Sequence, residues 1–133
     1  MSIFQSKLAL VIDDDVKSIK VMQQLLEYVE VESIAIPDSY RLEELLQGVA
    51  VPDVIFLDLE MPRSNGYSVL EFLQGDSRFK EVPVVAYTTH ISHLNDARDA
   101  GFHSFLGKPV DGDLFPENLA KILQGVPVWE VPS

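Results

Sequence analysis

Apolar and polar residues follow two different periods along this chain. Short apolar runs bounded by polar or turn-forming residues are typical of buried strands, and they fall at 8–12, 31–36, 54–57, 83–87 and 105–106. Between these runs, apolar residues recur at steps of three and four, which is the spacing of one helix face. Helices are therefore expected at about 16–29, 38–49, 67–74, 92–101 and 113–124.

The helical segments carry recognisable ends and buried faces. Asp15 is expected to cap the first helix, and Asp38 or Ser39 the second, because these side chains accept hydrogen bonds from free backbone N–H groups. Pro116 falls in the first turn of the last helix, where no N–H is needed. The residues expected to face the core are Val16, Ile19, Met22, Leu26 and Val29 in the first helix, Leu42, Leu45, Leu46 and Val49 in the second, and Leu114, Leu119, Ile122 and Leu123 in the last.

Strict alternation of strand and helix predicts an α/β fold with a parallel sheet, helices on both faces and right-handed crossovers. The expected architecture is a five-stranded, flavodoxin-like (βα)5 sheet of order 2-1-3-4-5. One domain covers 1–133, with its core at about 7–124 and a C-terminal tail at 125–133. The tail is apolar for a chain end. We expect a packed or frayed end, with a docking element anchored by Trp129 as the alternative.

Polar side chains collect where the predicted strands stop. Asp13 and Asp14 follow the first strand, Asp58 the third, and Lys108 the fifth, while Thr88 and Thr89 follow the fourth. Ligands of an open parallel sheet bind beyond the carboxyl ends of its strands, so these side chains are expected to share one site. Taken alone, the acidic run 13–15 could be a solvated turn that caps a helix.

The charge balance restricts the function. Lys and Arg number 10 against 21 Asp and Glu, which gives a formal net charge of −11. A chain this acidic is not expected to bind nucleic acid by itself, because a phosphate backbone needs a cationic face. The chain has no cysteine, which excludes disulfides and thiolate chemistry. Its early apolar run is far too short to span a bilayer, so a cytoplasmic protein without a membrane segment is expected.

A chain that brings three carboxylates together must either protonate one of them or bind a cation. Two unit charges ~4 Å apart repel by roughly 4 kcal/mol at an effective dielectric near 20. Asp13, Asp14 and Asp58 become neutral with Lys108 and one Mg²⁺, a hard cation that prefers oxygen ligands in phosphoryl-transfer sites. Together with the hydroxyl of Thr88, this set offers what anionic phosphoryl oxygens require.

These motifs resemble the receiver domain of bacterial response regulators, over about residues 7–124. The matching segments are Leu-Val-Ile-Asp-Asp at 10–14, Asp-Leu-Glu-Met-Pro at 58–62 with Gly66, Ala-Tyr-Thr at 86–88 and Lys-Pro at 108–109. The resemblance implies that Asp58 takes a phosphoryl group from a phosphohistidine on a histidine kinase or phosphotransfer protein. It also implies Mg²⁺, with Mn²⁺ as a substitute, held by Asp14, Asp58 and the backbone carbonyl of Glu60, while Asp13 acts through water.

The resemblance assigns further roles. Lys108 is expected to pair with a phosphoryl oxygen, and the Thr88 hydroxyl to bond another. Phe105 takes an aromatic switch position, with ordinary packing as the alternative, and a cis peptide is expected before Pro109.

Three positions near the site vary within this family or depart from its commonest pattern. Thr89 stands where a small residue is usual, and its bulk is expected to narrow access to Asp58. Glu60 and His90 are expected to meet across the pocket mouth and to set the lifetime of the phosphoryl group. His90 and His93 leave a second metal site open, although no further soft ligand lies near them.

Three functions compete. The first is an active receiver acting alone, whose phosphorylation switches a protein-binding face of the fourth helix, fifth strand and fifth helix, with a homodimer through that face as an option. The second is a degenerate receiver that binds proteins without phosphorylation. The third is an aspartate-nucleophile phosphohydrolase, which Glu60 disfavours because those enzymes carry a second Asp at that place. A receiver assists only its own phosphorylation and slow autodephosphorylation, so an enzyme with an external substrate is not expected.

Overall fold

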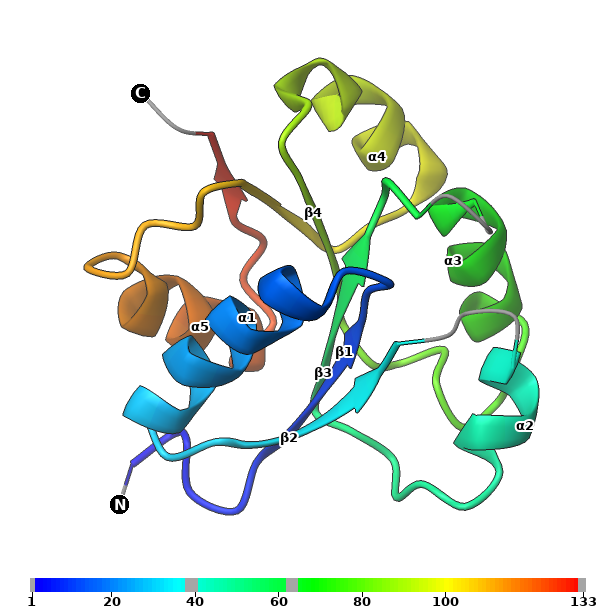
Figure 1. Cartoon of the computed structure of the whole chain (residues 1–133), viewed down its shortest axis with the longest axis horizontal. Helices are drawn as coiled ribbons and strands as arrows, with labels where there is room; N and C mark the ends of the chain where they lie inside the picture. The colour runs from blue at the N-terminus through cyan, green and yellow to red at the C-terminus, as the bar shows by residue number, and fades with distance from the viewer. Residues whose placement is uncertain (1, 38–40, 62–64, 132–133) are drawn as a thin grey trace.

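A computed structural model describes residues 2–37, 41–61 and 65–131. They form a parallel six-stranded sheet of order β2-β1-β3-β4-β5-β6 (Figure 1). The strands are β1 (Leu8–Ile12), β2 (Glu32–Ile36), β3 (Val54–Asp58), β4 (Val84–Thr88), β5 (Ser104–Gly107) and β6 (Trp129–Glu130). The helices are α1 (Val16–Tyr28), α2 (Leu42–Leu46), α3 (Gly66–Gln74), α4 (Leu94–Ala100) with a 3-10 turn η2 (Ile91–His93) before it, and α5 (Phe115–Leu123).

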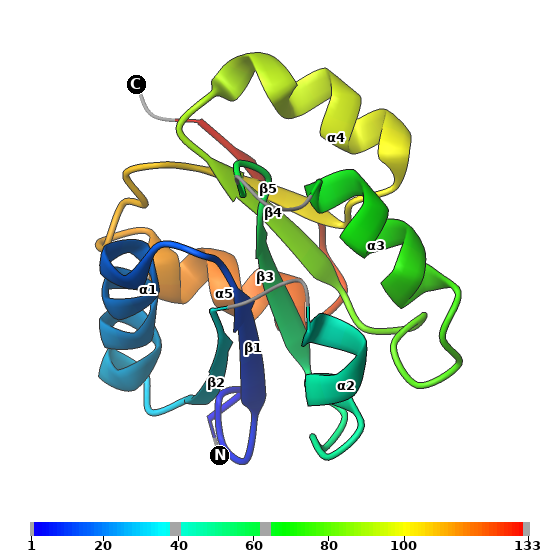
Figure 2. The same ribbon diagram turned by 45° about the vertical axis from the view of Figure 1, so that its right-hand side comes forward.

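The sheet is covered on both faces, as the alternation of strands and helices predicts. One apolar cluster packs the sheet against α2, α3 and α4, and a second packs it against α1 and α5. Figure 2 shows these two helix layers on opposite sides of the strands. Every residue of β3 and β4 is buried, which explains why their sequences show no polar alternation. The predicted fold class is therefore confirmed.

The predicted strand number is wrong by one, because the tail forms β6. The Phe105 backbone N–H donates to the Val128 carbonyl (2.8 Å), and the Val128 N–H donates to the Ser104 hydroxyl (3.0 Å). The Arg98 guanidinium of α4 lies 4.9 Å from the centre of the Trp129 ring. The prediction of a packed end is thus confirmed. Two strand residues are too few to show a period of two, which is why the pattern did not reveal the strand.

Helix ends differ from prediction in three places. The second helix is five residues long, and its expected caps Asp38 and Ser39 lie outside the described residues. Val16, which the helix period predicts on the buried face, is 58% exposed, because it starts α1 beyond the strand ends. Leu114 was expected inside and is 36% exposed, while its neighbour Phe115 is 1% exposed. Helix α5 begins at Phe115, so the buried face is shifted by one residue.

The predicted cap of the first helix is correct. The Asp15 carboxylate accepts the Lys17 backbone N–H (3.0 Å) at the start of α1. No helix in the described parts of the chain is long and apolar enough to cross a bilayer.

Candidate functional site

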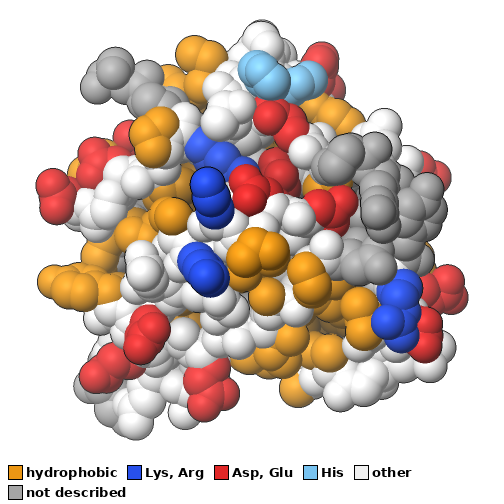
Figure 3. Space-filling view, in the orientation of Figure 1, with side chains coloured by type: hydrophobic (Ala, Val, Ile, Leu, Met, Phe, Trp, Pro, Cys, Tyr) orange, Lys and Arg blue, Asp and Glu red, His pale blue; other side chains and the backbone are white. Residues whose placement is uncertain are grey.

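The polar residues predicted at the strand ends meet at one edge of the sheet. Asp58 ends β3, Thr88 ends β4, and Asp13 and Lys108 directly follow β1 and β5. All these strands are parallel, so their carboxyl ends lie on the same side. Figure 3 shows acidic side chains beside lysine or arginine side chains near the centre of this face, with histidine above them.

Lys108 connects two of the carboxylates. Its ammonium nitrogen lies 3.6 Å from Asp13 Oδ2 and 3.7 Å from Asp58 Oδ1. The Lys108 side chain is 18% exposed and that of Asp13 is fully buried, so solvent screens this contact less than a surface ion pair. The peptide bond before Pro109 is cis, as predicted.

The two carboxyl groups have opposite pKa shifts. Burial raises the pKa of Asp58 to about 6, against the opposing effects of the Glu60 backbone N–H and the Lys108 charge. Burial acts in the same direction on Asp13, but hydrogen bonds from Ser18, Tyr87 and the Asp15 backbone hold its pKa below the ordinary value. The buried pair therefore contains one carboxylate that stays charged and one that binds a proton more readily.

The donor chemistry at this edge fits a hard divalent cation. Asp13, Asp14 and Asp58 supply carboxylate oxygens, and both oxygens of Asp14 are buried. With Lys108 the set carries two excess negative charges, which one divalent cation balances. Across the described ranges, no group of three or more acidic or histidine side chains is arranged so that it could hold a metal ion. The ligand set of the sequence analysis therefore stays a prediction.

A second polar group surrounds the carboxylate of Glu60. The Thr88 hydroxyl donates to Glu60 Oε1, the Thr89 hydroxyl lies 3.2 Å from Oε2, and His90 Nδ1 contacts Oε1. The His90 backbone N–H donates to the Thr88 hydroxyl (3.1 Å), which closes the group. Burial alone would raise the pKa of Glu60, but the Thr88 hydrogen bond and the charge of His90 hold it below its usual value.

The predicted contact between Glu60 and His90 is therefore present, while its effect on phosphoryl lifetime stays a prediction. His90 and His93 pack edge to face, with ring centroids 6.0 Å apart.

Phe105 is fully buried in β5, opposite Ala86 of β4 and Trp129 of β6. Its side chain packs in the cluster under α2, α3 and α4. The structure thus links the predicted switch position to the tail. The expected rotation of the Phe105 side chain, coupled to a movement of Thr88, would occur on phosphorylation. It stays a prediction.

Gly66 fixes the path of the chain after Asp58. A Cβ at Gly66 would lie 3.0 Å from Leu59 Cδ2 and 3.1 Å from both the Asp58 carbonyl oxygen and Leu59 Cα. The start of α3 thus packs directly on the backbone that carries Asp58, and the Asn65 side chain caps this helix at the Tyr67 N–H (2.8 Å). Pro62, which belongs to the quoted motif, lies outside the described residues.

Tyr87 belongs to the site, although its sequence pattern did not predict this. Its hydroxyl donates to Asp13 Oδ2 (2.6 Å), and its ring lies 4.4 Å below the Lys108 ammonium. Inside an apolar strand a tyrosine is an ordinary core residue. The one feature of the sequence that could have indicated a role is the position of Tyr87, directly before the predicted site residue Thr88.

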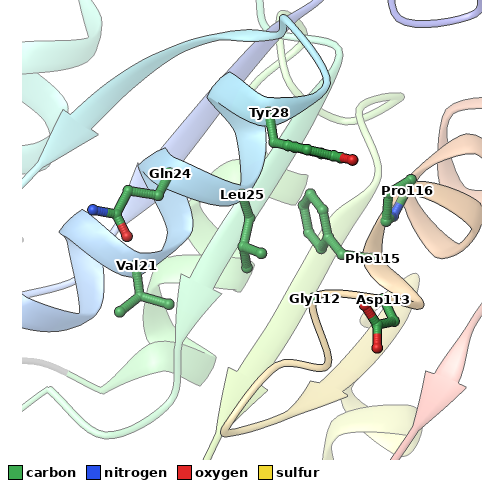
Figure 4. Close-up of a pocket in the computed structure, with 8 residues that line it drawn as sticks. All are labelled: Val21, Gln24, Leu25, Tyr28, Gly112, Asp113, Phe115 and Pro116. Atoms are coloured by element: carbon green, nitrogen blue, oxygen red, sulfur yellow. The ribbon is translucent and has the colours of Figure 1, made fainter.

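The site opens into a pocket of about 380 Å³. Asp58, Lys108 and Thr89 line it together with α1 residues such as Lys17 and Met22. A larger pocket of about 510 Å³ lies elsewhere, where Leu25 and Tyr28 of α1 face Phe115 and Pro116 of α5 (Figure 4). It contains none of the strand-end residues, so the smaller pocket is the candidate functional site.

Comparison with known proteins assigns the family. The model of the response regulator receiver domain matches residues 9–120. The chain belongs to the response regulator receiver domain family.

Relatives and solved structures agree with this assignment. The chain is 30% identical over 109 residues to stress response regulator protein 1 of Candida tropicalis, covering 79% of this chain but 41% of that protein. It is 24% identical over 119 residues to the polar-differentiation response regulator DivK of Brucella anthropi, covering 88% of this chain and 96% of DivK. The chain spans 19% of protein RcaC of Microchaete diplosiphon and 14% of sensor histidine kinase CheAY of Helicobacter pylori.

Among solved structures, a response regulator receiver protein of Burkholderia phymatum superposes with a TM-score of 0.75 at 27% identity, covering 91% of this chain and 97% of that one. The chemotaxis response regulator CheY4 of Vibrio cholerae gives a TM-score of 0.72 at 25% identity, covering 89% and 96%.

Proposed function

We propose that this chain is an active, cytoplasmic phosphoacceptor switch that takes a phosphoryl group on Asp58. The donor is a phosphohistidine on a histidine kinase or phosphotransfer protein, and the modified domain changes its contacts with a protein target. The observation that carries the proposal is the position of Asp58. Its carboxylate ends a fully buried strand, lies 3.7 Å from the Lys108 ammonium and borders an open pocket.

The chemistry follows from these contacts. A carboxylate oxygen of Asp58 bonds to phosphorus while the phosphorus–nitrogen bond of the donor breaks, and the nitrogen keeps the electron pair and takes a proton. The pKa of Asp58 is about 6, so this carboxyl is mostly ionised at neutral pH and available as a nucleophile. The Lys108 ammonium contacts Asp58 before the transfer and would pair with a phosphoryl oxygen after it. Such a transfer depends on positioning and charge neutralisation, so no histidine base is needed.

A bound Mg²⁺ would supply further positive charge to the phosphoryl oxygens. The resemblance to the receiver family implies that Asp14, Asp58 and the backbone carbonyl of Glu60 would hold it, with Asp13 acting through water. Oxygen atoms of this kind are the ligands that Mg²⁺ prefers.

The hydroxyls of Thr88 and Thr89 both donate to the carboxylate of Glu60, which lines the pocket. The Thr88 hydroxyl is bonded to Glu60 and therefore has to leave that carboxylate to bind a phosphoryl oxygen. A change at Thr88 reaches β5 through the β4–β5 pairing and reaches β6 through the pairing of Phe105 with Trp129. We place the switched surface on α4, β5 and α5 with β6 at its outer edge, where a homodimer or a target would meet the domain.

The test is the intact mass of the purified chain after incubation with Mg²⁺ and acetyl phosphate. One phosphoryl adduct is expected on the native chain, none on Asp58→Asn, and none when EDTA replaces Mg²⁺. Asp99→Asn is the matched control, because Asp99 is an exposed residue of α4 and its variant should take the adduct normally. An adduct on Asp58→Asn would refute the assignment. No adduct on the native chain from acetyl phosphate or from a phosphorylated histidine kinase would favour the binding-module alternative.

A further inference from the structure

Tyr87 has the packing of a core residue. It is 1% exposed and lies in the cluster between the sheet and helices α1 and α5. Its ring meets that of Phe56 edge to face, with centroids 6.4 Å apart. Phenylalanine would fill this space equally well, so packing alone does not explain the hydroxyl.

The hydroxyl binds the buried carboxylate of Asp13. It donates to Oδ2 across 2.6 Å, and Oδ1 of the same group accepts the Asp15 backbone N–H across 2.9 Å. Hydrogen bonds to an ionised acceptor are short and about twice as strong as neutral ones. A buried phenol generally finds some partner, so this contact alone would be compatible with a satisfied core tyrosine.

The ring makes a second polar contact, with Lys108. The ammonium nitrogen lies 4.4 Å from the ring centre, while it is 3.6 Å from the Asp13 oxygen that the Tyr87 hydroxyl binds. One side chain therefore holds both partners of an ion pair, the anion through its hydroxyl and the cation through its face. Lysine has a long flexible side chain, and fixing its end between a ring and a carboxylate removes most of its rotamer freedom.

We propose that Tyr87 is a positioning residue that holds Asp13 and Lys108 where the ammonium reaches Asp58. This inference rests on the proposed function of Asp58, because the benefit of a fixed ammonium appears when the phosphoryl oxygens form. A group that is already in place for the transition state needs no reorganisation during transfer. Without the hydroxyl, Asp13 loses a donor and the ion pair loses one of the two Tyr87 contacts that hold it next to Asp58.

Two substitutions separate the contacts. Tyr87→Phe keeps the ring and removes the hydroxyl, whereas Tyr87→Leu removes both. Phe115→Leu is the matched packing control, because Phe115 is equally buried in the same cluster and reaches the ring of Phe56 at 6.0 Å. Urea unfolding of each variant records how much stability the packing change costs.

The kinetic measurement is phosphoryl uptake from acetyl phosphate at saturating Mg²⁺. For Tyr87→Phe we expect the maximal rate to fall roughly 3- to 10-fold, with the half-saturating donor concentration changed less than about 2-fold. Tyr87→Leu should fall further, and Phe115→Leu should keep its rate even if it is less stable. Native kinetics in Tyr87→Phe, or an equal loss in Phe115→Leu, would overturn the proposal.

A spectroscopic measurement tests the geometry without phosphorylation. The Tyr87 ring current should displace the ε-methylene proton resonances of Lys108 in the metal-free protein. Tyr87→Phe should keep most of that displacement and shift the Asp13 carboxyl carbon, while Tyr87→Leu should abolish the displacement. If Asp58→Asn accepts the adduct, the proposed function fails but this measurement still tests Tyr87. Unchanged Asp13 and Lys108 resonances in both Tyr87 variants would refute the positioning role alone.

Discussion

The hydroxyl of Thr88 donates a hydrogen bond to the carboxylate of Glu60. This contact joins the end of β4 to the residue two positions after Asp58, and Thr89 and His90 contact the same carboxylate. The Thr88 hydroxyl thus already donates its hydrogen bond to a carboxylate. In the proposed function the same hydroxyl donates to a phosphoryl oxygen. Glu60 and the phosphoryl group would compete for Thr88.

Removing the Glu60 carboxylate should therefore speed phosphoryl uptake. Glu60→Ala frees the Thr88 hydroxyl and removes a negative charge from the pocket mouth, while it keeps the backbone carbonyl. The expected gain in initial rate from acetyl phosphate is about 3- to 10-fold, as for one charge in a partly solvated site. Glu60→Gln keeps an acceptor for Thr88 without the charge and so separates the two causes. A slower Glu60→Ala would contradict the competition.

Glu60 and His90 should act together on the lifetime of the phosphoryl group. Their side chains are in contact, so Glu60→Ala and His90→Ala are expected to be non-additive in autodephosphorylation. We expect the double variant to differ from the product of the single effects by roughly 2- to 5-fold, as for a partly exposed pair. Decay of the purified phosphoprotein, followed by intact mass, gives all four rates. Independent effects would exclude a shared role.

Deprotonation of Asp58 should lower the stability of the metal-free protein. The folded pKa of about 6 lies above the ordinary value of 3.8, so the folded state binds this proton more tightly than the unfolded chain. Stability is therefore lost as pH rises from about 4 to 6, and the loss persists above that range. Between pH 5 and pH 8 the native chain should lose about 1–2 kcal/mol more than Asp58→Asn. Urea unfolding in EDTA measures the free energy of unfolding of both proteins at each pH. If it changes equally with pH in the native chain and in Asp58→Asn, the pKa of Asp58 is not raised.

Gly66→Ala should destabilise the fold although alanine is the better helix former. The new Cβ would meet the Asp58 carbonyl oxygen and Leu59 Cα at 3.1 Å, and neither backbone atom yields easily. A cost of about 1–3 kcal/mol in urea unfolding is expected, as for other overpacked sites. Gly48→Ala is the matched control, because among the described residues no atom beyond its chain neighbours lies within 4 Å of the Cβ it would add. Equal stability of the two variants would argue against the close approach.

The sixth strand should contribute measurable stability. Trp129→Ala removes the ring from the Arg98 guanidinium and from the cluster that contains Phe105. The expected loss is about 1–3 kcal/mol, since the ring is only partly buried. Val126→Ala, in the same tail but at a residue 47% exposed, should change stability by less than about 0.5 kcal/mol. If both variants are as stable as the native chain, the contacts of Trp129 with Arg98 and with the apolar cluster do not stabilise the fold.

Local pattern determined much of this molecule. The fully apolar run 54–57 predicted a strand covered on both faces, and every residue of β3 is buried. Asp13, Asp58 and Lys108 were predicted to share a site, and Lys108 lies within 4 Å of both carboxylates. This worked because parallel strands bring their carboxyl ends to one edge, so position along the chain translates directly into position in space.

The tertiary structure decided what depends on contacts between distant segments. Tyr87 looked like a strand residue, and only packing brought its hydroxyl to Asp13 and its ring under Lys108. Strand β6 is too short to have a period and exists because the edge of β5 offers backbone partners. The sequence by itself determined the fold class and the residues at the strand ends, since the periodicity of each segment and the alternation of strands and helices are properties of the linear chain. Which groups hold one another there depends on side-chain geometry that only the folded chain creates.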